Sequence, residues 1–169
     1  MSTNTTPPDI TPGAFWRGLG QRPVGVTVVT SKGAEGPVGF LGLSFAHVSA
    51  APPVVLVSVG LKTGALTAIR DSACFAVNQL SADQTTLAEA FGGALPQADR
   101  FAGIDHAPLV TGAPVFATAL AGFDCRVIRT VETEGAITFF GHVVGLVTRD
   151  GAPLIAHQGG FRALTPQDI

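Results

Sequence analysis

Apolar segments rich in valine and phenylalanine alternate with short polar or glycine-containing segments through most of the chain after residue 23. Runs of this length and composition are typical of β-strands. We expect strands at Val24–Ser31, Val38–Phe45, Val54–Val59, Cys74–Leu80, Val115–Arg129, Gly135–Thr148 and Leu154–His157. Turn-forming residues predict hairpins at Gly33–Gly36, Glu132–Gly135 and Asp150–Gly151.

The N-terminal part of the chain predicts a loose arm followed by one short helix. Residues 1–10 are polar and interrupted by proline, whereas Thr11 and Pro12 offer an N-cap and a proline at the first helical position. One side of this helix carries the apolar residues Phe15, Trp16 and Leu19. We assign residues 1–10 to a flexible arm and residues 11–169 to a single domain.

Two further short helices are expected between the strands. One covers Ala65–Arg70 with Thr63 as its N-cap, and the other follows Ser81, where Gln84 completes a capping box. Because strands and helices do not alternate regularly, the pattern favours an antiparallel barrel over a doubly wound sheet. Glycines inside the strand patterns indicate bends, bulges or the close approach of a flat ligand, namely Gly39, Gly42, Gly141 and Gly145.

Composition narrows the function classes. Of 169 residues, 46% are hydrophobic and 13% are charged, and the formal net charge is -2. This profile excludes a disordered chain and argues against nucleic-acid binding, which depends on Lys and Arg. Little charge and much apolar surface predict an oligomer, most simply a twofold homodimer.

The sequence also predicts a location and a redox environment. It has no run of the roughly 18 apolar residues that a membrane-spanning helix needs, and its first twenty residues do not resemble an export signal. We therefore expect a cytoplasmic protein that does not bind membranes. Cys74 and Cys125 are too few and too far apart for a disulfide framework, and we expect two buried thiols.

Common catalytic motifs are absent from the sequence. Four histidines are scattered singly, without the spacing of a zinc site, and we expect His47 and His142 to be packing residues. No metal site is predicted. Lys62 and Thr63 precede a predicted helix, where they suit either a bound phosphate or an N-cap beside a solvated lysine. The glycine-containing strand at 39–45 suits either a planar ring or an ordinary bent strand.

Several segments, in order and spacing, resemble the short-chain flavin reductase family. The resemblance covers about residues 14–164. The matching segments are Pro23–Thr30, Val38–Phe40, Ser44–Phe45, Val48–Ser49, Pro52–Val57, Phe75–Leu80, Asp99–Gly103, Gly112–Val115 and Pro153–Leu154, followed by His157 and Phe161.

The resemblance implies a fold, an activity and partners. The fold is a mainly β, antiparallel split barrel of Greek-key type that binds FMN, usually as a homodimer. The activity is reduction of FMN or FAD by NADH or NADPH, with hydride moving from nicotinamide C4 to flavin N5. Many relatives supply the reduced flavin to a partner flavin-dependent monooxygenase.

The resemblance also implies site residues. Phe40, Leu41, Gly42, Leu43 and Ser44 would border the isoalloxazine ring, and Ser49 would lie near the ribityl chain. The flavin phosphate would be held by Ser58, Lys62 and Thr63, with Asn78 and Arg100 nearby. His157, the candidate catalytic residue, and Phe161 would lie where nicotinamide docks. A structural histidine that closes the barrel end is the alternative for His157.

Two positions depart from the family pattern. Relatives commonly carry Thr and Asn or Ser where this chain has Leu41 and Leu43, so two side-chain hydrogen bonds to flavin are missing. Two other functions therefore stay open. One is a split-barrel flavoprotein that keeps its flavin bound and acts on another small molecule. The other is a noncatalytic module that binds flavin or haem.

Overall fold

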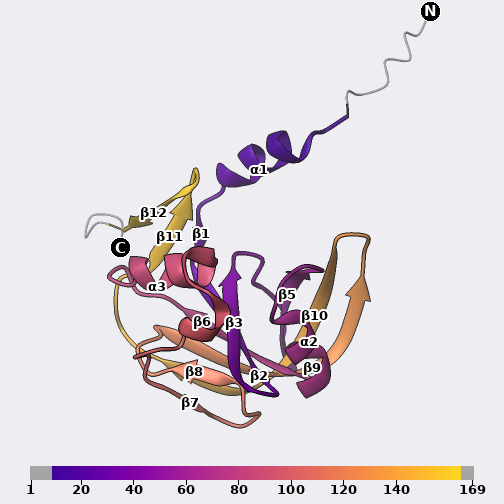
Figure 1. Ribbon diagram of the computed structural model, residues 1–169, viewed down its shortest axis with the longest axis vertical. Helices are drawn as coiled ribbons and strands as arrows, with labels where there is room; N and C mark the ends of the chain where they lie inside the picture. Colours follow the sequence, from indigo (N-terminus) through magenta and orange to yellow (C-terminus); the bar gives the residue numbers. More distant parts are fainter. Residues whose placement is uncertain (1–8, 165–169) are drawn as a thin grey trace, which may run out of the picture.

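The computed structural model describes residues 9–164, and most of its elements are strands (Figure 1). A seven-stranded sheet has the order β3-β2-β6-β9-β10-β5-β4, a three-stranded sheet has the order β1-β11-β12, and β7 pairs with β8. The strands are β1 Val24–Gly25, β2 Thr27–Gly33, β3 Gly36–Gly42, β4 Ala46–Ala50, β5 Pro53–Gly60, β6 Cys74–Gln79, β7 His106–Pro108, β8 Pro114–Phe116, β9 Ala121–Glu132, β10 Ala136–Thr148, β11 Leu154–His157 and β12 Gly160–Ala163. Within residues 9–164, all pairings between these strands are antiparallel.

The first predicted strand is divided between two sheets. Val26 separates β1 from β2, and its backbone N–H donates to the carbonyl of Leu154 while its own carbonyl accepts from Leu80. The chain therefore leaves the three-stranded sheet and enters the seven-stranded sheet at a buried valine. Because Val26 is as apolar as its neighbours, the hydrophobic pattern does not mark this junction.

Other strand predictions also need correction. The strand expected over Val115–Arg129 is two strands, β8 and β9, which belong to different sheets. Strands β4, β7 and β12 were not predicted; they are short and mostly exposed or half-buried, so hydrophobic periodicity gives little signal. The turn at Asp150–Gly151 does not close a hairpin, because it connects β10 to β11 in another sheet. The predicted hairpins at Gly33–Gly36 and Glu132–Gly135 are confirmed.

Helix α1, Pro12–Gly20, begins as predicted, and Thr11 Oγ1 accepts a hydrogen bond from the Ala14 N–H at 3.2 Å. None of its residues is buried, and it extends away from the sheets (Figure 1). Trp16 is 68% exposed and Phe15 is 54% exposed. The apolar side of α1 therefore has no partner within residues 9–164 that covers it. The predicted arm at residues 1–10 lies almost wholly outside the described residues.

The other helices differ from expectation at their first residues. Helix α2, Leu66–Ser72, has Ala65 as its N-cap, so the prediction for Thr63 was wrong. Instead, the Thr63 N–H donates to the Gly60 carbonyl at 2.9 Å, which places a turn between β5 and α2. Helix α3, Thr85–Glu89, has Gln84 as N-cap, and a π-helical turn, Ala90–Ala94, and a 3-10 turn, Gln97–Asp99, follow it.

Only half of the predicted capping box forms at α3. The Ser81 N–H donates to the Gln84 side-chain oxygen at 2.9 Å. The Ser81 hydroxyl, however, donates to the Asp83 carboxylate and does not cap a backbone N–H of the helix.

Two clusters of buried residues form the main core. One gathers side chains of the seven-stranded sheet and α2, including Val57, Ile69, Phe75 and Phe139. The second lies between the start of β2, the turn after α3, β8 and β11, and includes Val28, Leu80, Phe91, Phe116 and Leu154. The three-stranded sheet is thus attached to the rest of the molecule through a separate apolar cluster.

The strand glycines are explained by protein packing. A Cβ at Gly42 would lie 2.6 Å from Val29 Cγ2, and one at Gly39 would lie 2.8 Å from Phe91 Cε1. Gly141 and Gly145 each follow a register shift in the β9–β10 pairing, so the predicted bulges are confirmed there. At Gly39 and Gly42 the missing side chain makes room for core residues.

The two thiols lie where the sequence predicted. Cys74 and Cys125 are free and buried. Burial, together with the smaller effect of the neighbouring negative charge of Asp124, raises the pKa of Cys125 to about 12. Within residues 9–164, no helix combines the length and the apolar character needed to span a membrane.

Candidate functional site

A cleft of about 700 Å³ lies where the end of β3, the end of β5, the β11–β12 hairpin and the end of α1 meet. Its volume is within the range of about 300–1,000 Å³ that is usual for cofactor and small-molecule sites. The lining is mostly apolar, with few polar groups. It comprises Trp16, Leu19, Gly20, Arg22, Val24, Phe40–Ser44, Ser58, Gly60, Thr63 and Ala156–Phe161.

All five residues predicted to border a flavin ring, Phe40–Ser44, line this cleft. Phe40 and Leu41 come from β3 and are half-buried, each packed against one of the two core clusters. Leu43 follows the strand and is 40% exposed. One wall of the cleft is therefore an apolar strand end whose side chains are fixed by the core behind them.

Ser44 fixes this wall to the neighbouring strand β5. Its hydroxyl donates to the Ser58 carbonyl at 3.1 Å and accepts from the Ser58 N–H at 2.9 Å. The Ser58 hydroxyl forms a further hydrogen bond of 2.8 Å with the Thr138 hydroxyl on β10. The three hydroxyl groups thus connect the segment after β3 to β5 and β10, which lie toward the opposite edge of the seven-stranded sheet.

The opposite wall is the β11–β12 hairpin. Its turn is Gln158–Gly159, with φ angles of 50° and 75°, which are the values of a type I′ turn. His157 pairs with Gly160 and Ala156 pairs with Phe161, so both predicted residues line the cleft. Both are half-buried, and within residues 9–164 the His157 imidazole forms no hydrogen bond. The ring is available to a ligand.

The predicted phosphate-binding residues are partly brought together. Ser58 and Thr63 line the cleft, whereas Lys62 lies in the same turn with its side chain exposed. The Thr63 side chain is half-buried near Gly60. One hydroxyl group and one mobile cation are thus adjacent at the β5 end of the cleft.

Besides Lys62, three predicted site residues do not line the cleft. Asn78 is fully buried; its amide nitrogen donates to Val28 and Pro114 carbonyls and to the Thr30 hydroxyl, and its oxygen accepts from the Phe116 N–H. The Arg100 guanidinium donates to the carbonyls of Leu95 and Gly39 and to the Gln97 side chain. The Ser49 hydroxyl donates to the Pro52 carbonyl at 2.6 Å. These polar groups are used inside the protein.

Sequence reasoning did not identify the residues that α1 and the hairpin turn contribute. Trp16, Leu19 and Arg22 line the cleft, as do Gln158 and Gly159. The apolar side of α1 was visible in the sequence, but its contact with the hairpin was not. The Gln158 N–H donates to the Gly20 carbonyl at 2.8 Å, and the Gln158 side chain donates to that of Gln21.

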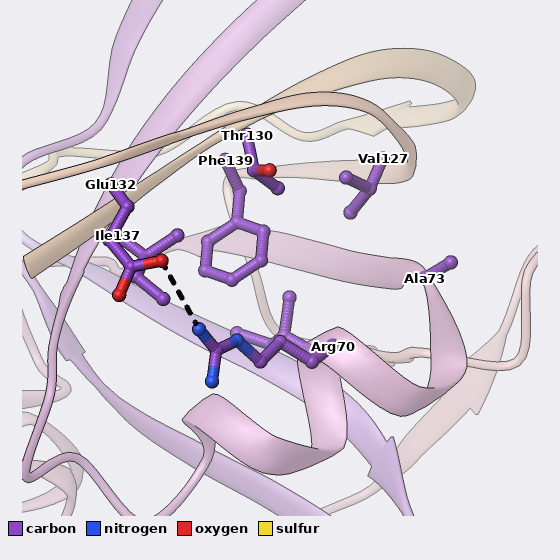
Figure 2. A pocket seen from close by; sticks show the side chains of 8 residues that line it. Arg70, Ala73, Val127, Thr130, Glu132, Ile137 and Phe139 are labelled. Carbon is purple, nitrogen blue, oxygen red and sulfur yellow. Dashed lines mark ion pairs between the residues drawn. The ribbon is translucent and has the colours of Figure 1, made fainter.

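A second, smaller pocket contains none of the predicted residues. It has a volume of about 150 Å³ and lies between α2 and the ends of β9 and β10 (Figure 2). Figure 2 shows Arg70 and Glu132 at this pocket, joined by the dashed line of an ion pair. The Arg70 Nη2 and Glu132 Oε2 atoms are 3.7 Å apart, and both side chains are more than half exposed. Exposed ion pairs of this kind contribute about 0–1 kcal/mol. The pocket is too small for a flavin.

Known proteins match the chain over nearly its whole length. The model of the flavin reductase like domain family matches residues 19–165. The chain is 32% identical to the FMN reductase (NADH) RutF 2 of Methylorubrum extorquens, with 97% of this chain and 95% of the relative covered. It is 34% identical to the reductase subunit HsaB of a flavin-dependent monooxygenase of Mycobacterium tuberculosis, with 94% and 85% covered.

A solved structure agrees with the fold. The NADH:FAD oxidoreductase SgcE6 of Streptomyces globisporus, in complex with NAD and FAD fragments, superposes with a TM-score of 0.84 at 31% identity. The alignment covers 91% of this chain and 93% of that one. The predicted split-barrel fold and the predicted activity class are confirmed, and the chain belongs to the flavin reductase like domain family.

Proposed function

We propose that this protein transfers hydride from NADH or NADPH to FMN or FAD in the 700 Å³ cleft, and that it releases the reduced flavin to a flavin-dependent monooxygenase. The observation that carries the proposal is the position of the His157–Phe161 hairpin, which forms the same cleft as the Phe40–Ser44 wall. When bound, the nicotinamide supplies a hydride from C4 and the flavin accepts it at N5.

The residues of the cleft hold the two rings at reacting distance and exclude water. Phe40, Leu41 and Leu43 present an apolar surface to a flat ring, and Gly42 between them is buried and adds no side chain. Little acid or base chemistry is required of the protein, because positioning supplies most of the rate enhancement for this kind of transfer. This explains an enzyme whose sequence lacks the common catalytic motifs.

We assign the flavin phosphate to the turn between β5 and α2. Thr63 offers a hydroxyl group at the edge of the cleft, Lys62 offers a cation that is free to reach it, and Ser58 lies on the adjoining strand. His157 lies on the opposite wall and is assigned to the nicotinamide side, where its imidazole polarises the amide or lies near flavin N1.

The names of similar proteins support the choice of NADH as hydride donor and of FMN and FAD as acceptors. The M. extorquens protein is named as an FMN reductase that uses NADH, and the S. globisporus protein as an NADH:FAD oxidoreductase. The M. tuberculosis protein is named as the reductase subunit of a monooxygenase. NADH is therefore the first donor to test, with both flavins as acceptors.

We further propose that the protein is a homodimer. A nine-residue helix is marginally stable in water unless tertiary contacts hold it. Helix α1 exposes Phe15 and Trp16, and β4 at the edge of the seven-stranded sheet exposes Val48. A second copy that covers such surfaces would stabilise them. Light scattering during size-exclusion chromatography tests this; a monomer at micromolar concentration would contradict it.

The function is tested by following loss of reduced nicotinamide absorbance with purified protein, NADH or NADPH, and added FMN or FAD. Turnover that rises with free flavin is the expected result. Stoichiometric flavin that copurifies and does not exchange would indicate a flavoprotein acting on another molecule. Ligand binding without turnover in all four pairings would indicate a noncatalytic module.

A further inference from the structure

Arg22 is the only Lys, Arg, Asp or Glu among the described residues that line the cleft. Its side chain is exposed, and it lies between the end of α1 and the start of β1. The rest of the lining is apolar or uncharged apart from His157. A single cation in such a site favours ligands that carry negative charge.

The backbone of Arg22 is held in one place relative to the hairpin. Its N–H donates to the Leu19 carbonyl at 3.1 Å, and Pro23 directly follows, which favours an extended backbone at Arg22. Val24 then pairs with Ala156 on β11. If this antiparallel register is continued, Arg22 lies opposite Gln158. Gln158 is the first residue of the hairpin turn and directly follows His157.

The guanidinium is not used inside the described part of the protein. No hydrogen bond or ion pair of its side chain is found within residues 9–164. By contrast, Arg70 pairs with Glu132, and Arg100 and Arg149 donate to backbone carbonyls. Arg22 is therefore available, and its planar fork of N–H groups suits phosphate oxygens.

The position of Arg22 in the fold indicates which phosphate group it binds. The proposed flavin phosphate site, Lys62 and Thr63, follows β5 of the seven-stranded sheet, whereas Arg22 precedes β1 of the three-stranded sheet beside His157. We propose that Arg22 binds the diphosphate bridge of the nicotinamide dinucleotide. This inference rests on the proposed function, because it assumes that nicotinamide docks at the His157 wall.

The test compares Arg22→Gln with the wild-type protein and with Arg126→Gln. Arg126 is exposed on β9 and does not line the cleft, so its substitution matches the change in charge without touching the site. The probe is ADP-ribose, which carries the diphosphate but no nicotinamide. Trp16, the only tryptophan, lines the cleft and reports binding through its fluorescence.

For Arg22→Gln we expect the Kd of ADP-ribose and the KM for NADH, measured with FMN as acceptor, to rise about 10-fold, as for loss of a charge-assisted hydrogen bond. The KM for FMN should stay within twofold, and Arg126→Gln should match the wild-type protein. Arg22→Lys should recover part of the affinity, because it restores the charge but not the fork.

Three outcomes would overturn the inference. One is unchanged ADP-ribose affinity in Arg22→Gln, and another is wild-type protein that does not bind ADP-ribose. The third is a raised KM for FAD with unchanged KM for NADH, which would assign Arg22 to the flavin diphosphate. Failure of the proposed function is distinguishable from failure of this inference. The first would appear as absence of turnover in the wild-type protein, whereas ADP-ribose binding is measured without turnover.

Discussion

The Ser44 hydroxyl and the backbone of Ser58 form a reciprocal pair of hydrogen bonds, 3.1 Å from hydroxyl to carbonyl and 2.9 Å from N–H to hydroxyl. β3 ends at Gly42, and beyond it the Ser44 side chain bonds to the backbone N–H and carbonyl of Ser58 on β5, as the backbone of a paired strand would. The pair holds Leu43 and Ser44 against the neighbouring strand. The Phe40–Ser44 wall of the cleft consequently keeps its shape beyond the last ladder hydrogen bond of β3.

Substitution of Ser44 by Ala should loosen this wall. The Ser58 N–H loses its partner, which costs about 1–3 kcal/mol, and the KM for flavin should rise several-fold while the KM for NADH changes little. Steady-state kinetics with each substrate varied in turn measures both effects. The control is Ser81→Ala, whose hydroxyl bonds to Asp83 away from the cleft. Equal flavin KM in the two variants would contradict the assignment.

Substitution of His157 by Ala should slow flavin reduction by about 10-fold, the effect of losing one hydrogen bond worth about 1.4 kcal/mol in the transition state. The ring lines the cleft and lies in a hairpin whose backbone pairing remains in the variant. Rapid-mixing measurement of flavin reduction under saturating NADH isolates this step. His106→Ala on β7 serves as the control. Unchanged rates with NADH and NADPH would remove His157 from the site.

Leu43 offers a test of the departure from the family pattern. It is 40% exposed in the cleft, so Leu43→Asn adds a hydrogen-bonding group without opening the core. We expect tighter flavin binding, by about 5-fold to 10-fold for one net hydrogen bond of about 1 kcal/mol. Leu41→Thr is the contrasting variant, because Leu41 packs against the second core cluster and its loss should lower stability. Flavin titration by fluorescence measures the affinity.

Much of the strand content followed from hydrophobic runs, but the sheet to which each strand belongs did not. The run at 24–31 contains no turn signal or break in its valines, and the hydrogen bonds of Val26 show that it changes sheets. Strand β12 was missed because Arg162 and Ala163 are exposed, which leaves no alternating pattern. Strand pairing depends on contacts distant in sequence, which local patterns do not encode.

The lining of the cleft was predictable where the family resemblance pointed to adjacent residues, such as Phe40–Ser44. The lining was not predictable where two segments distant in the sequence meet. Gln21 and Gln158 are 137 positions apart, and the hydrogen bond between their side chains holds the segment that contains Arg22 beside the hairpin. The resemblance also placed Asn78 and Arg100 near the flavin phosphate, yet the structure uses both side chains to satisfy backbone groups.

Asn78 should therefore affect stability and not flavin binding. Asn78→Leu leaves the buried Phe116 N–H without an acceptor and removes three donated hydrogen bonds. We expect the free energy of unfolding to fall by about 2–4 kcal/mol, with the KM for flavin unchanged in the folded fraction. Denaturant unfolding measures the loss, and the control is Thr86→Leu, since the Thr86 side chain is exposed and makes no hydrogen bond within residues 9–164. A raised flavin KM at normal stability would restore Asn78 to the binding site.

The Cys125 thiol should make stability depend on pH in the alkaline range. Burial raises its pKa from 9.0 to about 12 in the folded protein, so the unfolded chain loses this proton first as pH rises. Stability from this group is complete below about pH 9 and falls by up to about 1.4 kcal/mol per pH unit between pH 9 and 12. Cys125→Ala removes the thiol and should flatten that decline, although the variant is less stable at neutral pH. Denaturant unfolding of both proteins from pH 8 to pH 10.5 measures the difference, which should shrink as pH rises; parallel curves would contradict a buried, neutral thiol at this position.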